Sequence, residues 1–138
     1  MMELFPLFYY KGGDYMIRLI QRRLIIPRGD TGSFTIPTLV SVNDGDIAVF
    51  SIYDNLTHKT IFEKQFAATA ENLTISLEHE DTVNITPKSY LWDIKIYNEP
   101  TYNNENVLIG GREINSYYAA YSLPVCEIRE VAENVPRA

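Results

Sequence analysis

The stretch that decides the fold is Tyr90-Leu91-Trp92-Asp93-Ile94-Lys95-Ile96-Tyr97. Every second residue from Tyr90 to Ile96 is aromatic or β-branched, whereas Asp93 and Lys95 are charged. An alternation with a period of two residues places these two sets on opposite faces of a β-strand. The pattern predicts a central strand that holds Trp92, the only tryptophan of the chain, in the core and turns Asp93 and Lys95 towards water.

Further short strands surround this one, separated by turn residues. Patterns typical of strands occupy residues 17–26, 33–36, 48–53, 60–66, 73–77 and 117–128. Asn43-Asp44-Gly45-Asp46 is the clearest turn, because Asp-Gly tolerates the left-handed backbone of a tight turn. Residues 78–84 can form a single helical turn. About seven or eight short strands without an amphipathic helix predict an all-β fold, an antiparallel immunoglobulin-like β-sandwich.

Composition divides the chain into three parts, of which residues 16–130 are the predicted sandwich domain. Residues 131–138 are polar, and we expect a flexible tail there. Residues 1–15 end in Lys11-Gly12-Gly13-Asp14-Tyr15, whose codons can contain a bacterial ribosome-binding sequence just before Met16. They are therefore expected to be either a mis-annotated leader, with Met16 as the natural start, or an N-terminal arm that packs on a neighbouring protein.

Charge and cysteine content exclude several classes of function. The net charge of −6 disfavours both sequence-independent nucleic-acid binding, which needs clustered Lys and Arg, and binding to an acidic membrane surface. Cys126 is the only cysteine, so the chain can form neither an internal disulfide nor a cysteine-based metal site. No apolar run approaches the roughly 20 residues of a membrane helix.

Residues that bear catalytic or metal-binding chemistry are few. Asp44, Asp46 and Asp54 offer oxygen ligands, but their spacing does not match an EF-hand loop and fits solvated turns better. His58 and His79 are the only histidines, and a zinc site needs further ligands. No Gly-x-Ser-x-Gly nucleophile motif is present. We therefore expect no catalytic residue, no metal and no cofactor, and a protein that is not an enzyme.

Tyrosines and asparagines are concentrated in the last third of the chain. We expect the segment from Asn98 to Ser116, which holds Pro100 and Gly110-Gly111, to be one long irregular loop. Exposed Tyr beside Asn can anchor a protein interface or stack on sugars. The predicted binding surface comprises Tyr97, Tyr102, Asn103, Asn104, Arg112, Tyr117 and Tyr118.

Several stretches together are similar to the N-terminal domain of phage baseplate upper proteins. They are residues 29–36, residues 45–52, residues 77–82, residues 90–96 and a closing strand that ends near Val125. The resemblance covers roughly Arg28 to Ile128, and Asn98–Ser116 is an insertion relative to that family.

The resemblance implies a non-enzymatic structural protein of the virion, made in the bacterial cytoplasm. Such a protein would join a phage or prophage tail or baseplate through contacts with other virion proteins, as a homo-oligomer within the assembly. The alternative is a carbohydrate-binding β-sandwich that recognises glycans of the host surface. That alternative predicts two or three aromatic rings aligned on one face or loop edge, with Asn, Asp or Arg nearby.

Overall fold

The structure is a computed structural model that describes residues 16–117 and 122–131. The expected leader or arm at residues 1–15, Tyr118 of the predicted surface, and residues 132–138 of the expected tail lie outside these ranges.

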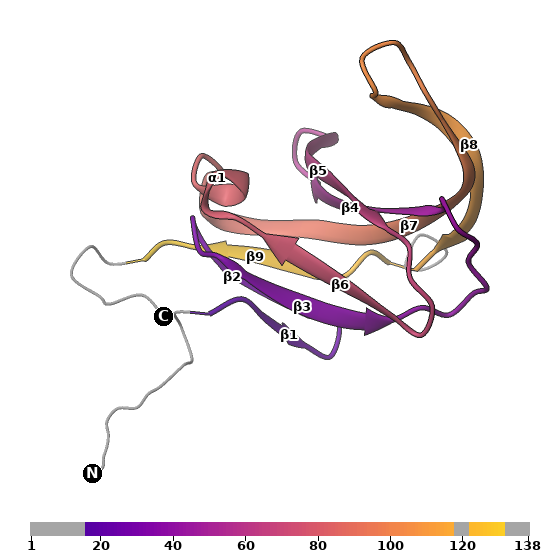
Figure 1. Ribbon diagram of the computed structural model, residues 1–138. Coiled ribbons are helices and arrows are strands. Elements are labelled where there is room, and N and C mark those ends of the chain that lie inside the picture. The colour runs from indigo at the N-terminus through magenta and orange to yellow at the C-terminus, as the bar shows by residue number, and fades with distance from the viewer. Residues whose placement is uncertain (1–15, 118–121, 132–138) are drawn as a thin grey trace.

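Nine β-strands and one short helix make up the described part of the chain (Figure 1). They are β1 (Arg18–Ile20), β2 (Arg23–Pro27), β3 (Gly32–Pro37), β4 (Ile47–Asp54), β5 (Lys59–Ala67), β6 (Asn72–Leu77), α1 (His79–Thr82), β7 (Lys88–Tyr102), β8 (Leu108–Ser116) and β9 (Val125–Arg129). The larger sheet has the order β1-β2-β9-β7-β4-β5, with β8 also paired to β7, and the smaller sheet is β3-β6. The prediction of an all-β, sandwich-like fold is confirmed.

The larger sheet is mixed, so the prediction of purely antiparallel strands is wrong. β2 runs parallel to β9, with Leu24 opposite Cys126 and Ile26 opposite Ile128. The single strand expected at residues 17–26 is instead the antiparallel hairpin β1–β2, in which Ile20 lies opposite Arg23. Gln21 has a φ of 57°, and this left-handed residue lets the chain reverse and bring β2 alongside β9.

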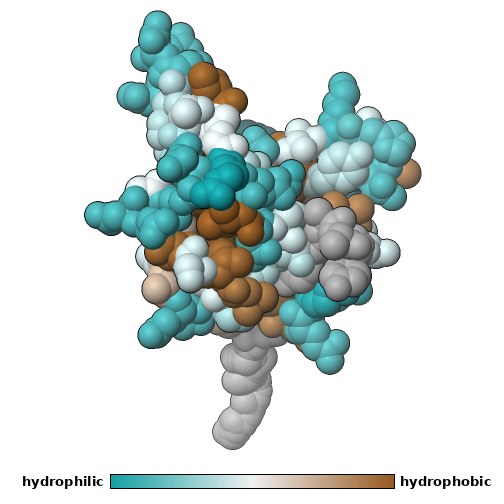
Figure 2. Space-filling model, turned by 90° about the vertical axis from the view of Figure 1, so that its right-hand side faces the viewer, coloured by the Kyte–Doolittle hydropathy of each residue, from teal (hydrophilic) through white to brown (hydrophobic). Residues whose placement is uncertain are grey.

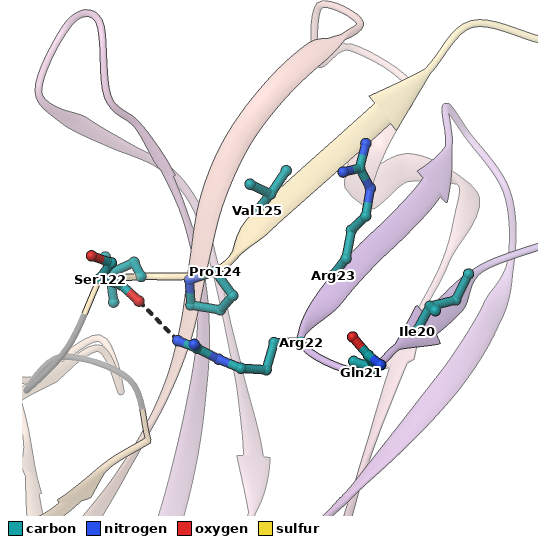
Figure 3. A pocket seen from close by; sticks show the side chains of 8 residues that line it. Ile20, Gln21, Arg22, Arg23, Ser122, Pro124 and Val125 are labelled. Carbon is teal, nitrogen blue, oxygen red and sulfur yellow. Dashed lines mark hydrogen bonds between the residues drawn. The ribbon is translucent and has the colours of Figure 1, made fainter.

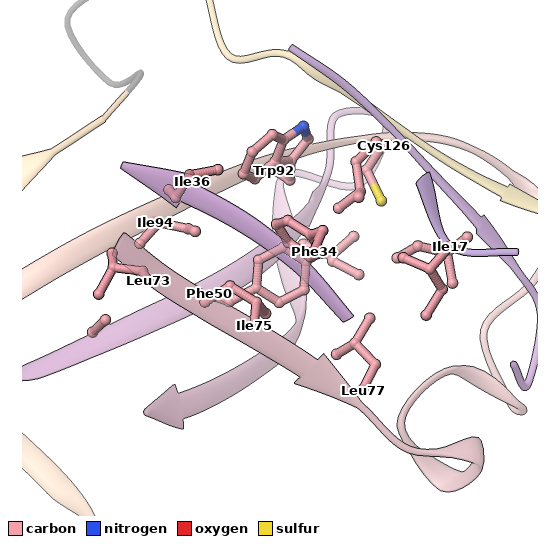
Figure 4. Packing of buried hydrophobic residues seen from close by; sticks show 14 of the residues in the cluster. Ile17, Phe34, Ile36, Phe50, Leu73, Ile75, Leu77, Trp92, Ile94 and Cys126 are labelled. Carbon is pink, nitrogen blue, oxygen red and sulfur yellow. The ribbon is translucent and has the colours of Figure 1, made fainter. Parts of the chain in front are cut away.

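The core lies between the two sheets and is built around Trp92 of β7 (Figure 4). Phe34 of β3 contacts the indole edge-to-face, with ring centroids 5.8 Å apart, and Phe50 of β4 lies 6.1 Å from it. The indole N–H donates a 3.0 Å hydrogen bond to the Arg22 carbonyl, so its polar atom is satisfied. The sequence prediction that Tyr90, Trp92, Ile94 and Ile96 face the core is confirmed, since all four are buried.

Asp93 does not face water, contrary to the prediction. It is buried, and one carboxylate oxygen accepts a 2.6 Å hydrogen bond from the Ser116 hydroxyl while the other accepts one from the Ile94 amide. Ser116 is the last residue of β8 and lies opposite Lys95, so β8 supplies the hydroxyl that bonds to this carboxylate from the neighbouring strand. Lys95, on the same face, is partly exposed.

The segment from Asn98 to Ser116 is not an irregular loop but a β-hairpin. β7 continues to Tyr102, and β8 returns from Leu108. Asn103 makes the reversal possible, because its side-chain oxygen accepts hydrogen bonds from the amides of Glu105 (2.8 Å) and Val107 (3.0 Å). The asparagines thus close a turn between two strands rather than filling a loop.

Pro100 and the glycine pair mark a bulge in this hairpin. The register shifts between Asn98 and Thr101 of β7. Gly111 has a φ of 148°, and a Cβ there would lie 3.1 Å from the Pro100 Cα, so the close approach of the two strands requires glycine. A bulge bends the strand that carries it, and Figure 1 shows the hairpin curving upwards from the larger sheet.

The closing strand is shorter than predicted. Residues 117–128 were expected to form one strand bent at Pro124, whereas β9 begins only at Val125. Pro124 still joins the sheet through its carbonyl, which accepts a 3.0 Å hydrogen bond from the Trp92 amide. β8 and β9 therefore pair with successive parts of the same edge of β7.

Candidate functional site

The feature that departs most from a sandwich is the outer part of the β7–β8 hairpin. β4 ends its pairing with β7 where Ile47 lies opposite Tyr97. Beyond that point β8 is the one described strand that pairs with β7, from Asn98 opposite Arg112 to Tyr102 opposite Leu108. We call residues 98–112 the arm. A two-stranded ribbon is marginally stable in water by itself, so other contacts must hold it.

A buried polar cluster fixes the base of the arm. The side-chain amide of Asn98 donates to both carboxylate oxygens of Asp46, at 3.1 and 3.3 Å, and Asn98 and Asp46 are both buried. The Arg112 guanidinium donates a 2.7 Å hydrogen bond to the Asn98 side-chain oxygen. Asp46 also accepts a 2.8 Å bond from the Asn43 amide. One amide thus links both strands of the arm to the turn before β4.

Apolar side chains are exposed along the arm. Tyr102, Val107 and Ile109 are 44%, 51% and 64% exposed. The arm is the highest part of Figure 1 and rises at the top of Figure 2, where brown hydrophobic surface interrupts the teal. Exposed apolar side chains on a ribbon with two open edges are typical of a surface that another protein covers.

A shallow hollow of about 570 Å³ lies beside the base of the arm. Its walls include Asp44, Glu99, Tyr102 and Arg112, together with the buried pair Asp46 and Asn98. The lining is mainly polar and contains a single aromatic ring. Because Asn98 and Arg112 already bond to each other, the arrangement positions the arm and presents no activated nucleophile or acid–base pair.

The structure separates the residues of the predicted binding surface. Tyr102, Asn103 and Asn104 lie together at the tip of the arm, whereas Tyr97 and Arg112 lie at its base. Tyr117 lies past the other end of β8. Its hydroxyl donates to the Pro37 carbonyl at 2.6 Å and accepts from the Leu39 amide at 3.2 Å, so it ties β8 to the chain after β3.

Val107 and Ile109 were missed by the sequence reasoning. The signal was present, since Val107 and Ile109 stand two residues apart, as side chains on one face of a strand do. Gly110-Gly111 follows directly and is typical of a loop, so the strand at Leu108–Ser116 was not predicted. Asn98 was missed because its burial depends on Asp46, which is distant in sequence and was expected to be a solvated turn residue.

Groups with reactive potential are dispersed. Asp46 precedes β4 and Asp54 ends it, so they cannot share an ion with Asp44. Within residues 16–117 and 122–131, no three His, Cys, Asp or Glu side chains lie close enough together to hold a metal ion. Burial raises the pKa of the Cys126 thiol far above its usual range, which suppresses the reactive thiolate.

None of the helices in the described residues has the length and apolar character needed to cross a membrane.

Comparison of the chain with protein-family models, with curated protein sequences and with solved structures found no match.

Proposed function

We propose that the protein is a non-enzymatic structural protein of a phage or prophage virion, whose arm docks onto another protein of the tail or baseplate. The observation that carries the docking role is the arm itself, a two-stranded ribbon with Tyr102, Val107 and Ile109 exposed. The virion setting is supported by the resemblance to baseplate upper proteins. The docking role and the virion setting both require a rigid β-domain that displays a contact surface.

We further infer that the sandwich is of the immunoglobulin type. Its larger sheet has a central order β2-β9-β7-β4-β5, with β2 parallel to the last strand, and β3 pairs with β6 opposite it. In the lettering of immunoglobulin strands, β2, β9, β7, β4 and β5 correspond to A′, G, F, C and C′, and β3 and β6 correspond to B and E. A sheet of this order facing a B-E pair is like the arrangement of variable-type domains. α1 occupies the corner before β7, as the connection from E to F does.

A second feature that supports this type is a tyrosine at the start of β7. Tyr90 is buried, and its hydroxyl donates a 2.5 Å hydrogen bond to the carbonyl of Thr86, four residues upstream. Immunoglobulin-like domains have a tyrosine corner at this place, with a hydroxyl that bonds to backbone a few residues earlier.

The docking proposal is tested on particles. Virions produced by a strain that carries the gene are purified by density gradient, and the chain is sought by mass spectrometry. We expect it in the particle fraction, and expect the arm variant Ile109→Glu to remain in the soluble fraction. Leu56→Glu is the matched control, since Leu56 is 80% exposed in the β4–β5 turn and outside the arm. A wild-type chain absent from particles would refute the virion role.

Glycan binding is the second candidate, and the hollow with Tyr102, Asp44 and Arg112 is the observation that favours it. Sugar sites combine an aromatic ring with polar side chains in this way. Of the tyrosines proposed for sugar stacking, Tyr102 and Tyr117 lie beyond opposite ends of β8 and cannot form one platform. Glycan-array binding that disappears in Tyr102→Ala would favour this function over the first.

A further inference from the structure

The outer face of the larger sheet carries a second hollow, of about 340 Å³, on β4, β5 and β7. Ser51 of β4 lies opposite Glu63 of β5 on one side and opposite Asp93 of β7 on the other. Directly opposed residues point to the same face of a sheet, with Cβ atoms about 5 Å apart. Phe50 and Ile52, which flank Ser51, belong to the core, so the row of three side chains lies on the face turned away from the core. We call this feature the sheet hollow.

Further side chains complete the walls of the sheet hollow. Tyr53 and Thr60, opposite each other in β4 and β5, extend the face on one side of the row, and Lys95 of β7 extends it on the other. Leu123, from the chain before β9, adds an apolar wall. The Tyr53 hydroxyl lies 3.3 Å from Nδ1 of His58, within hydrogen-bond distance, so the turn after β4 helps to orient the ring.

The wall at Leu123 is fixed by hydrogen bonds to the residues on both sides of it. Arg22 donates a 2.8 Å hydrogen bond to the Ser122 carbonyl, as Figure 3 shows beside the β1–β2 turn. The Trp92 amide donates one of 3.0 Å to the Pro124 carbonyl. The walls of the sheet hollow are therefore held in place by the sandwich itself, and such preorganisation favours binding of a ligand.

Charged groups of both signs reach the sheet hollow, and together they exclude several kinds of ligand. Asp93 is buried and accepts hydrogen bonds from Ser116 and the Ile94 amide. Among the described residues, Glu63 and Lys95 have neither a hydrogen-bond nor an ion-pair partner for their side chains. Two carboxylates disfavour a phosphate or sulfate, and the ammonium group disfavours a metal ion or an organic cation. Charged walls also disfavour an apolar ligand, which would desolvate them without hydrogen bonds. A neutral polar ligand remains.

A sugar ring matches these walls. A carboxylate only accepts hydrogen bonds and an ammonium group only donates them, whereas a hydroxyl does both. Hydroxyls on neighbouring carbons of a sugar can thus donate to Glu63 and accept from Lys95, while the C–H groups of the ring pack against an aromatic side chain such as Tyr53. Small-molecule sites have volumes of about 300–1,000 Å³, and the sheet hollow lies at the lower end of this range, which suits the end of a glycan chain.

We propose that the sheet hollow binds a neutral sugar unit of a glycan. Glu63 accepts a hydrogen bond from one sugar hydroxyl, Lys95 donates one to another, and Tyr53 packs against the ring. This inference goes beyond the docking role and rests on neither the arm nor the virion setting. It also gives glycan binding a different place from the hollow beside Tyr102.

The test uses the full chain and neutral sugars as probes. The methyl glycosides of glucose, galactose, mannose and N-acetylglucosamine are each titrated to about 50 mM, which covers the millimolar affinities of single sugar units. Amide chemical shifts are followed by NMR. We expect at least one sugar to give saturable shifts that are largest in residues 51–53, 60–63 and 93–95.

Two variants remove the charged contacts one at a time. Glu63→Ala removes the acceptor, and Lys95→Met removes the donor but keeps the aliphatic stem. Each should weaken sugar binding about tenfold or more, because a hydrogen bond to a charged group is lost. Gln65→Ala is the matched control, since Gln65 is exposed on β5, two residues from Glu63 on the same face, and does not line the sheet hollow. This control should bind like the wild-type chain, and circular dichroism checks that all three variants are folded.

Three outcomes would overturn the proposal. The first is a wild-type chain whose amide shifts respond to no sugar of the panel. The second is sugar binding that survives Glu63→Ala and disappears in Tyr102→Ala, since this would place the glycan beside the arm. The third is a hollow that sodium phosphate or methylammonium occupies more tightly than any sugar, since the ligand would then be charged. A chain that enters particles but binds no sugar refutes this inference alone, whereas one that binds sugar but never enters particles refutes only the virion role.

Discussion

The sandwich and the arm share one strand but are stabilised by different interactions. Up to Ile96, β7 buries every second side chain against the smaller sheet, and Trp92 and Ile94 are fully enclosed. After Tyr97 the same strand has neither a second sheet to cover it nor β4 beside it, and Tyr102 is exposed. The sandwich is held by apolar packing, whereas the arm is held by the hydrogen bonds of Asn98 at its base and Asn103 at its tip. The comparison predicts that core substitutions unfold the protein and arm substitutions leave it folded.

The largest effect is expected from Trp92→Ala. Truncating a fully buried aromatic side chain removes its transfer free energy and leaves a cavity, which costs about 3–5 kcal/mol, and here it also removes the contacts with Phe34 and Phe50. Urea unfolding followed by circular dichroism measures the loss. Tyr102→Ala, on the same strand but in the arm, is the matched control and should change the free energy of unfolding by less than about 0.5 kcal/mol. Equal losses from the two substitutions would erase the distinction between the regions.

An intermediate effect is expected from Asn98→Ala. The substitution removes the amide that joins Asp46 to Arg112. The buried Asp46 carboxylate then loses a hydrogen-bond donor, which should lower the free energy of unfolding by about 1–3 kcal/mol. Hydrogen exchange should become faster in the arm first, because among the described residues its two strands pair only with each other. Asn104→Ala, at the exposed tip, is the control. Unchanged exchange in residues 99–111 would show that the polar cluster does not hold the arm.

The sequence predicted the sandwich far better than the arm, and the reason is physical. Buried strands impose a period of two on their own residues, so the strand of Trp92 and its neighbours could be recognised locally. The arm depends on pairs that are distant in sequence, such as Asp46 with Asn98, and on a bulge of β7 opposite Gly111, where Pro100 and the glycine pair resemble a loop. The parallel pairing of β2 with β9 was missed for the same reason, because it joins residues about a hundred positions apart through a turn at Gln21.

A smaller effect is expected from Tyr90→Phe, which tests whether the sandwich has a tyrosine corner. The substitution removes the hydroxyl that donates to the Thr86 carbonyl and keeps the ring in the core. A net hydrogen bond contributes about 0.5–1.5 kcal/mol, and we expect a loss of free energy of unfolding in that range. Tyr97→Phe, further along β7, is the comparison and should cost less. If both substitutions are neutral, the corner contributes nothing to stability, and the support that it gives to the immunoglobulin-type sandwich is withdrawn.

The smallest effect is a pH dependence of stability at Glu127 of β9, whose neighbour in the sheet is β2. Hydrogen bonds from Arg129 and Arg23 hold the pKa of Glu127 below its ordinary value. A carboxylate with a lowered pKa in the folded state contributes stability at pH values above its unfolded pKa, near 4.5, and loses it as the pH falls through the folded value. Urea unfolding at pH 7 and at pH 3 should therefore show a larger loss for the wild-type chain than for Glu127→Gln. The difference should stay below about 1 kcal/mol, because Arg23 is half exposed and water screens the pair. Identical losses in both proteins would mean that these ion pairs do not stabilise the pairing of β2 with β9.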